Sequence, residues 1–133
     1  MENLYIEPTE ITPRVDFDSK NKKFELSGVS RPEDVVAFYE SIIFKIEKYI
    51  NQLLKNENTI ANIKFQLVFD LNYINSASSK YILQILGLFK KIYLKGATVN
   101  CTWYYEDLDD QILEDGEDLS DVIKMEFEFL ERQ

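Results

Sequence analysis

The chain begins with short runs in which hydrophobic and polar residues alternate. Arg14–Asp18 and Lys23–Gly28 alternate on either side of the polar turn Ser19–Lys22, which predicts a β-hairpin. Before the hairpin, the apolar piece Leu4–Ile6 is cut off by Pro8, which predicts a short edge strand. The N-terminal part of the chain is therefore predicted to contribute antiparallel strands to a sheet.

A long amphipathic helix is predicted after this hairpin, because apolar residues recur there every three or four positions. Ser30 and Glu33 form a capping-box pattern that places the start of the helix at Ser30. The pattern fades at the polar connection 55–58. The stripe predicted to face the core consists of Val35, Phe38, Tyr39, Ile42, Ile46, Tyr49, Ile50 and Leu53.

A central strand is predicted at Ile63–Phe69, where β-favouring residues are dense. The strand ends at Asp70, a polar turn follows, and a second amphipathic helix begins at about Lys80 and stops at Gly96. The buried stripe of this helix is predicted to comprise Ile82, Ile85, Leu86, Phe89 and Tyr93. A neighbouring apolar flank is either core or part of a docking surface, and it consists of Tyr81, Leu88 and Ile92.

The last third is predicted to contain the strand Ala97–Tyr105, a short acidic helix and the strand Met125–Leu130. The helix lies within residues 106–118, which hold eight acidic residues and no basic one, and Gly116 closes it. Strands joined by helices require right-handed parallel crossovers. The predicted fold class is therefore α/β, with a mixed β-sheet and an N-terminal hairpin packed against two main helices plus a short acidic helix. One domain is expected over residues 1–133.

Composition supports one domain, because 133 residues with 45% hydrophobic content suffice for one core. No apolar run approaches the ~20 residues of a membrane span. The start of the chain lacks the basic and apolar regions of a signal peptide. Cys101, the lone cysteine, lies in a strand-like run and is predicted to be a buried thiol. These features predict a cytoplasmic protein.

Histidine content and charge exclude several classes of function. The chain has no histidine, which removes the usual general base, the Ser-His-Asp and Cys-His arrangements and nearly all zinc sites. The net charge is −9, and the acidic excess lies in residues 106–133, with 12 acidic and 2 basic residues, against 12 and 13 in residues 1–105. Neither nucleic acid nor an anionic membrane surface is an expected partner.

Other candidate chemistry is poorly supported by the sequence. The acidic run 106–118 lacks the ligand spacing of a calcium loop. Asp70, at the end of a strand, has no second carboxylate for acid–base catalysis. With 4 glycines in the chain, no phosphate-cradling motif occurs. We therefore predict no catalytic residue, no metal site and no cofactor, and the acidic run is a solvated face or a surface for a basic partner.

The segment Asp70–Lys80 contains the strongest candidate site. A helix N-terminus presents free backbone N–H groups and a partial positive charge. From Asn75 to Ile85 there is no acidic residue to complement that charge. Two interpretations stay open: either Asn75 or Ser76 merely caps the helix, or one of the hydroxyls accepts a phosphate that the helix end and Lys80 then hold.

The chain resembles the SiaC-type family of regulatory phosphoproteins, whose STAS-like fold is similar to that of anti-sigma-factor antagonists. The resemblance spans nearly the whole domain. It rests on Ile6-Glu7-Pro8-Thr9, Thr12-Pro13, Asp70-Leu71-Asn72-Tyr73-Ile74-Asn75-Ser76-Ala77-Ser78-Ser79-Lys80, Trp103-Tyr104-Tyr105-Glu106-Asp107-Leu108-Asp109, Gly116-Glu117-Asp118 and Met125-Glu126-Phe127.

This resemblance implies a non-enzymatic phosphorylation switch. A serine/threonine kinase related to anti-sigma-factor kinases would modify a hydroxyl at the start of the helix after the central strand, and a PP2C-type phosphatase would remove the phosphate. The unmodified protein would bind and activate a partner such as a diguanylate cyclase, in cyclic-di-GMP and biofilm signalling. Carried over to the matching turn, the acceptor is Ser76, with Ser78 and Ser79 as alternatives.

The same resemblance sets expectations for the surroundings of the acceptor. The phosphate environment at the helix start is expected to comprise Asn75, Ala77, Ser78, Ser79 and Lys80. The partner surface is expected to comprise Asn72, Tyr73, Tyr81, Gln84 and Leu88. The alternative function is a STAS-like module that binds a small ligand or nucleotide without phosphorylation, and an enzyme using Asp70 is a third class.

Overall fold

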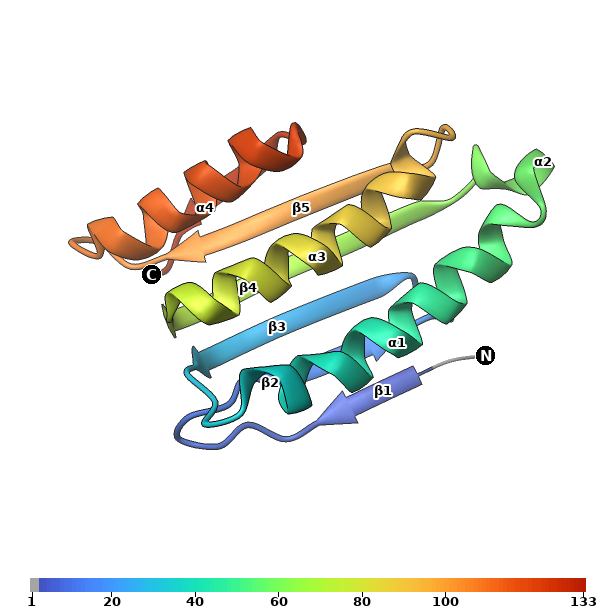
Figure 1. Cartoon of the computed structure of the whole chain (residues 1–133). Helices are drawn as coiled ribbons and strands as arrows, with labels where there is room; N and C mark the ends of the chain where they lie inside the picture. Colours follow the sequence, from blue (N-terminus) through green and yellow to red (C-terminus); the bar gives the residue numbers. More distant parts are fainter. Residues whose placement is uncertain (1–2) are drawn as a thin grey trace.

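Six strands form one mixed sheet in the computed structural model, which describes residues 3–133 (Figure 1). Met1 and Glu2, which belong to the predicted domain and to the start of the chain considered above, lie outside the described residues. The strands follow the order of the sequence across the sheet. They are β1 (Asn3–Ile6), β2 (Arg14–Asp18), β3 (Lys23–Ser30), β4 (Lys64–Ile74), β5 (Thr98–Tyr105) and β6 (Phe127–Glu131).

The sheet is antiparallel at its N-terminal end and parallel beyond it, as predicted. β1 pairs with β2 and β2 with β3 in antiparallel register, so that Val15 lies opposite Leu26 and Phe17 opposite Phe24. From β3 to β6 every neighbouring pair is parallel. Each parallel connection therefore needs a crossover, which a helix provides.

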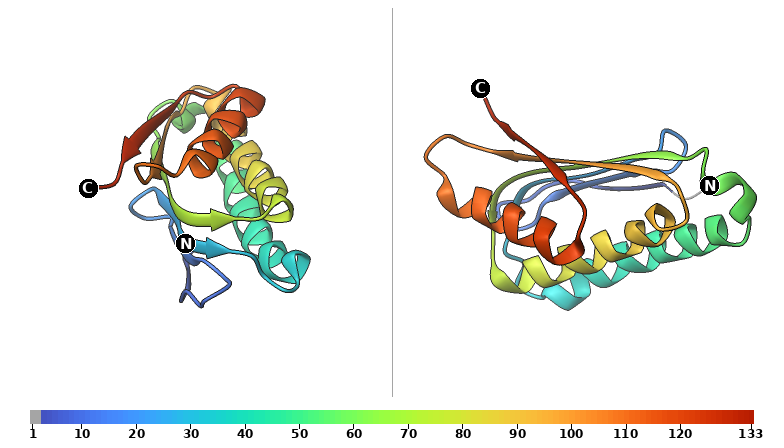
Figure 2. Two further views of the ribbon diagram at one scale, coloured as in Figure 1. Left: turned by 90° about the vertical axis from the view of Figure 1, so that its left-hand side faces the viewer. Right: turned by 90° about the horizontal axis from the view of Figure 1, so that it is seen from above.

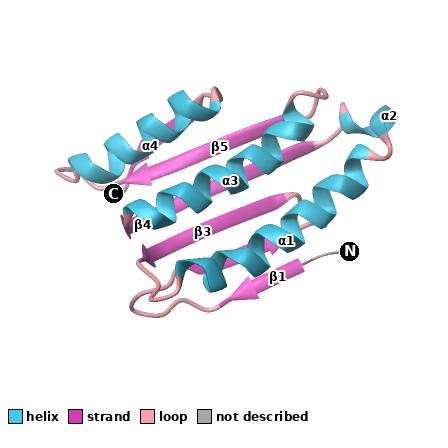
Figure 3. Cartoon of the chain, viewed as in Figure 1, coloured by secondary structure: helices cyan, strands magenta, loops and turns pink. Residues whose placement is uncertain are grey.

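The main helices lie against one face of the sheet, and the other face is open (Figures 2 and 3). Between them, side chains from the helices and from that face form one hydrophobic core, which includes Phe17, Phe65, Phe89 and the fully buried Trp103. The helices of the described residues are α1 (Val35–Leu54), the four-residue α2 (Glu57–Ile60), α3 (Ser76–Tyr93) and α4 (Asp110–Ile123). None of them combines the length and apolar character needed to cross a bilayer.

The predicted buried stripes are confirmed with one exception. On α1 the five central positions from Tyr39 to Ile50 are buried, and on α3 the stripe from Ile82 to Phe89 is buried. Tyr93 was expected in the core but is 42% exposed, because the neighbouring Ile92, which is fully buried, takes the core position at the end of α3. Cys101 is buried as predicted, and burial raises the pKa of its thiol.

The predicted start of the first helix is wrong. Ser30 is the last residue of β3 and is fully buried, and α1 starts only at Val35. The cap is Asp34, whose side chain accepts a hydrogen bond of 3.0 Å from the N–H of Ala37. The capping-box pattern therefore does not mark the start of this helix. Ser30 pairs with Ile74 of β4, and its side chain is buried.

Gly116 was predicted to close the acidic helix, but it lies inside α4. The helix continues to Ile123, and Lys124 ends it in the left-handed conformation with φ 58°. A Cβ on Gly116 would come within 2.5 Å of the indole ring of Trp103. The glycine therefore lets α4 approach β5, and a short-range reading of glycine as a helix stop missed this long-range contact.

Candidate functional site

The central strand runs further than predicted and almost eliminates the expected turn. β4 extends to Ile74, because its last residues pair with β3 up to the contact of Ile74 with Ser30. A bulge at Gly28 and Val29 shifts the register there. Asn75 alone then separates the strand from α3, which begins at Ser76 rather than at about Lys80.

Asn75 caps α3, which decides between the two caps that the sequence left open. Its side-chain oxygen accepts a hydrogen bond of 2.8 Å from the N–H of Ser78, and its carbonyl oxygen accepts one of 3.1 Å from the N–H of Ser79. The first turn of α3 contains no acidic residue. The backbone N–H groups of Ser76 and Ala77 have no hydrogen-bond partner among residues 3–133 and stay available to an anion.

The three serines of this turn differ sharply in accessibility. Ser76 is exposed, Ser79 is half-buried and Ser78 is fully buried. The Ser78 hydroxyl accepts a hydrogen bond of 2.8 Å from the hydroxyl of Ser30 and donates one of 3.1 Å to the carbonyl of Ser30. An enzyme cannot reach that hydroxyl without opening the core, so Ser78 is an anchor of the helix start.

Tyr39 of α1 completes this buried hydroxyl chain. Its phenol lies 2.6 Å from the Ser30 hydroxyl, and burial raises the pKa of Tyr39 to about 12, against the opposing effect of its hydrogen bonds with Ser30 and Ser78. The phenol therefore stays protonated at neutral pH and serves as a donor. The chain joins α1, the end of β3 and the first turn of α3, and so it sets where Ser76 stands on the surface.

A depression of about 390 Å³ lies beside the start of α3. Helix α4 contributes Gln111 and Asp115 to its wall, and the Gln111 side chain donates a hydrogen bond of 2.8 Å to Asp115. The first turn of α3 has no carboxylate of its own, as the sequence indicated, but α4 brings the carboxylate of Asp115 into the lining of the same depression. The depression is lined by Tyr73, Ile74, Asn75, Ser76, Ser79, Gln111 and Asp115.

Asp115 should oppose folding slightly at neutral pH. Desolvation by burial raises its pKa above the ordinary value of 3.8, the Gln111 hydrogen bond lowers it, and Asp118 and Asp109 raise it. A carboxyl with a raised folded-state pKa stabilises the fold below its unfolded pKa, and this stabilisation is lost as pH rises through the folded value. We expect Asp115→Asn to raise the free energy of unfolding at pH 7 by up to about 0.5 kcal/mol.

Thermal unfolding of Asp115→Asn and of the unmodified chain at several pH values measures this difference. The gain should shrink as pH falls and vanish below the ordinary pKa of 3.8, where the carboxyl is protonated in both states. Glu117→Gln, which neutralises a carboxylate at an exposed position of α4, is the control. Equal gains for both variants would contradict an effect of the environment of Asp115.

The residues expected to form the partner surface differ in how accessible they are. Asn72, Tyr73 and Gln84 are exposed, and the 48% exposure of Tyr73 makes it available for contact. Tyr81 is half-buried and its ring stacks on Tyr39 at 5.7 Å. Leu88 is 7% exposed and lies in the core, so its assignment to a partner surface is wrong. The apolar flank of α3 that contains Leu88 packs against the core. The extra width of the apolar stripe on this helix therefore does not indicate a docking surface.

Asp70 forms an ion pair that sequence spacing did not reveal. The Arg132 guanidinium, just after β6, contacts the carboxylate of Asp70 and lies 3.6 Å from that of Glu106. The two residues of the Asp70 pair stand 62 positions apart in the chain. Asp70 thus joins the edge strand to the central strand through an arginine that it shares with Glu106.

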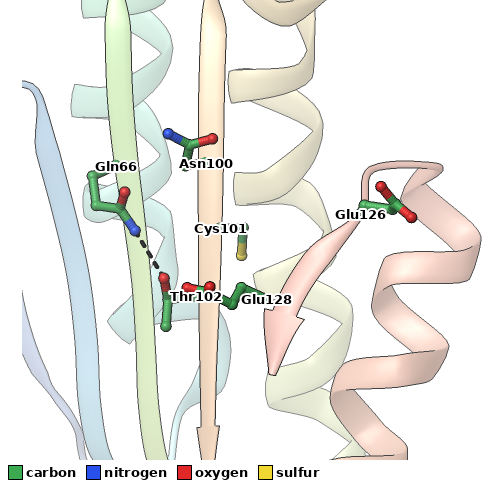
Figure 4. A pocket seen from close by; sticks show the side chains of 6 residues that line it. All are labelled: Gln66, Asn100, Cys101, Thr102, Glu126 and Glu128. Atoms are coloured by element: carbon green, nitrogen blue, oxygen red, sulfur yellow. Dashed lines mark hydrogen bonds between the residues drawn. The ribbon is translucent and has the colours of Figure 1, made fainter. Parts of the chain in front are cut away.

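A second depression of about 330 Å³ lies on the open face of the sheet (Figure 4). Figure 4 shows Gln66 and Thr102 turned toward each other, and the Gln66 amide donates a hydrogen bond of 3.0 Å to the Thr102 hydroxyl. Glu126 and Glu128 stand at the β6 side. Among residues 3–133 no group of three or more histidine, cysteine or acidic side chains is placed to hold a metal ion.

The fold and site together define a small α/β domain with an exposed serine at the start of the helix that follows the central strand. The family described as SiaC family regulatory phosphoprotein matches residues 6–132. The chain therefore belongs to the SiaC family, which confirms the resemblance inferred from its sequence. Because the match covers nearly the whole chain, the fold class is confirmed with it.

Known proteins from Pseudomonas aeruginosa are similar to the chain over its full length. The crystal structure of apo-SiaC is 22% identical, covers 100% of both chains and superposes with a TM-score of 0.79. SiaC in the crystal structure of its complex with the diguanylate cyclase SiaD, which it activates, is 22% identical, covers 97% of this chain and 99% of that one, and has a TM-score of 0.82. At this identity the likeness establishes the fold.

A curated relative gives the same picture. An uncharacterized protein of Pseudomonas aeruginosa (strain UCBPP-PA14) is 23% identical over 127 residues, which are 96% of this chain and 94% of that protein. The correspondence therefore extends from end to end and does not stop at one motif.

Proposed function

We propose that this chain is a non-enzymatic phosphorylation switch with Ser76 as its acceptor. The observation that carries the proposal is the contrast within one helical turn: the Ser76 hydroxyl is exposed, whereas the neighbouring Ser78 hydroxyl is buried and hydrogen-bonded. Ser79 is half-buried in the depression beside Asp115 and is the second choice. Membership of a family of regulatory phosphoproteins supports the same function.

The helix start is suited to hold a phosphate without rearranging the domain. The free N–H groups of Ser76 and Ala77 and the positive end of α3 favour a dianion there. Lys80 follows four residues later on the same side of the helix, at the spacing that brings two side chains together. Asp115 across the depression repels the phosphate and directs it outward, away from α4. The modification then changes the surface and leaves the core intact.

The proposed partners follow from family membership. We assign the transfer of phosphate to a serine/threonine kinase of the anti-sigma-factor-kinase type and its removal to a PP2C-type phosphatase, both in the cytoplasm. SiaC of Pseudomonas aeruginosa activates the diguanylate cyclase SiaD and forms a complex with it. The proposed target of this chain is likewise a diguanylate cyclase, which places the switch in cyclic-di-GMP and biofilm signalling.

Phosphorylation and its mimic provide the test of this function. In the presence of the anti-sigma-factor-type kinase encoded in the same genome, intact-mass spectrometry should show one phosphate on the unmodified chain and on Ser79→Ala, and none on Ser76→Ala. Ser76→Asp should weaken binding of the diguanylate cyclase of that genome about tenfold or more, or about 1.4 kcal/mol, because like charge is added at the docking surface.

Two results would contradict the assignment. Full phosphorylation of Ser76→Ala would move the acceptor to another hydroxyl, with peptide mapping deciding whether Ser79 carries it. Unchanged cyclase affinity for Ser76→Asp, measured by titration calorimetry with Ser76→Asn as the uncharged control, would exclude repulsion by the added charge.

A further inference from the structure

The outward side of α3 is unlike the rest of this acidic chain. From Ser76 to Lys95 there are four lysines and no acidic residue, although the net charge of the whole chain is −9. Figure 1 places α3 between α1 and α4 on the covered face of the sheet, with its outward side free. We call this side the α3 outer face, and it comprises Ser76, Lys80, Leu83, Gly87, Lys91 and Leu94 at helical spacing.

The charges on the α3 outer face are not used within the domain. Lys90 donates to the carbonyl of Ile123, and Lys95 pairs with Glu57 at 3.2 Å, so these two lysines hold neighbouring elements. Lys80 and Lys91 are exposed, and within residues 3–133 no ion pair or hydrogen bond engages their ammonium groups. These two lysines are 11 residues apart, which corresponds to about 16 Å along the helix.

Gly87 stands between the two lysines and has no role in packing the domain. A Cβ at this position would meet no atom within 4 Å. Glycine in a helix interior is less favourable than alanine, and this one is neither a cap nor a turn. It leaves a notch in the middle of the α3 outer face, where the axis of a second helix can come close because the side chain at the crossing point is absent.

We infer that the α3 outer face is the docking surface for an acidic amphipathic helix of the partner protein. The partner helix crosses α3 at Gly87, its apolar side contacts Leu83 and Leu94, and carboxylates about three turns apart meet Lys80 and Lys91. The inference rests on the proposed function, because it names the chemistry that the unmodified switch recognises. Charge complementarity selects an acidic partner, since the lysines are the only charged groups of this face.

The same face explains how phosphorylation would act on binding. A phosphate on Ser76 stands one turn from Lys80 and pairs with it, so that Lys80 is lost to the partner. The remaining negative charge then repels the carboxylates of the partner helix. Modification therefore acts at one end of the docking surface, while the notch at Gly87 stays unchanged.

The test measures binding of the purified diguanylate cyclase encoded in the same genome. Lys80→Glu/Lys91→Glu should bind it at least tenfold more weakly than the unmodified chain, and Gly87→Leu, which fills the notch, should also lose at least tenfold. Lys20→Glu/Lys64→Glu is the matched control, because both lysines are exposed, lie outside α3 and produce the same change in net charge. Circular dichroism and thermal unfolding establish that each variant is folded.

The outcomes separate the docking surface from the function. Loss of binding in both α3 variants and retention in the control support the inference. Binding by both α3 variants at the affinity of the unmodified chain overturns the docking surface and leaves the switch intact. An unmodified chain that binds no cyclase overturns the proposed partner and this docking role together. If Gly87→Leu does not fold, the lysine variant and the salt dependence of binding test the docking surface. The affinity of the unmodified chain for the cyclase should then decrease between low and high salt.

Discussion

Gly116→Ala should lower the free energy of unfolding by about 2–3 kcal/mol, the largest effect expected of any one-carbon change in this chain. The new methyl group would lie about 2.5 Å from the indole of Trp103. That ring is fully buried and donates a hydrogen bond of 2.9 Å to the carbonyl of Ile112. Its centroid lies 5.5 Å from that of the Phe69 ring. It cannot move aside cheaply, so α4 must shift away from β5.

Urea unfolding followed by fluorescence measures this loss, and Trp103 is the single tryptophan of the chain, so the signal reports on the contact itself. Gly87→Ala is the control, since it makes the same substitution inside α3 where the added carbon meets nothing within 4 Å. It should stabilise the protein by about 1 kcal/mol. Equal stability changes of the two variants would mean that α4 does not pack on Trp103 as described.

Ser30→Ala should destabilise the fold by about 2 kcal/mol, because it breaks the buried hydroxyl chain at its centre. The Ser30 hydroxyl lies 2.6 Å from the phenol of Tyr39 and donates a hydrogen bond of 2.8 Å to the hydroxyl of Ser78. Without it, the phenol loses its closest partner while it remains fully buried. The first turn of α3 should loosen at the same time, because Ser78 then keeps only its bond to the backbone.

Two measurements check the role of this hydroxyl chain. Thermal unfolding gives the stability, and amide hydrogen exchange at Ser78 and Ser79 reports on the first turn of α3, where exchange should become faster. Ser76→Ala is the matched control, since the same hydroxyl is removed from an exposed position in the same turn, and its stability should change by less than about 0.5 kcal/mol. A stability loss as large in the control would contradict a special role of the buried hydroxyl chain.

Periodicity predicted the elements of this fold because burial on one face imposes it directly. The hairpin of β2 and β3, the long helix α1 and the parallel order of the later strands were all predicted from alternation or helical spacing. The boundaries were predicted less well. The segment after Asp70 is a strand because β3 supplies hydrogen-bond partners for it, and a local reading of small polar residues as a turn contains no such information.

The candidate site was found from its sequence only in part. The segment and the lack of an acidic residue in the first turn of α3 follow from local chemistry, whereas the structure decided that Asn75, and not Ser76, is the cap. The difference between Ser76 and Ser78 does not, because it arises from the contact of Ser78 with Ser30, 48 residues earlier in the chain. Asp115 entered the site in the same way, through the packing of α4 beside α3.

By itself, the sequence determined the α/β class, the family and the segment that holds the proposed acceptor, because these depend on residue order and on local backbone preferences. Tertiary structure alone decided which serine faces solvent, which glycine packs on Trp103 and which one leaves a notch on α3. The physical reason is common to all three. Burial and close contact depend on residues that are distant in the chain. Two serines or two glycines therefore acquire different roles from the side chains that pack against them.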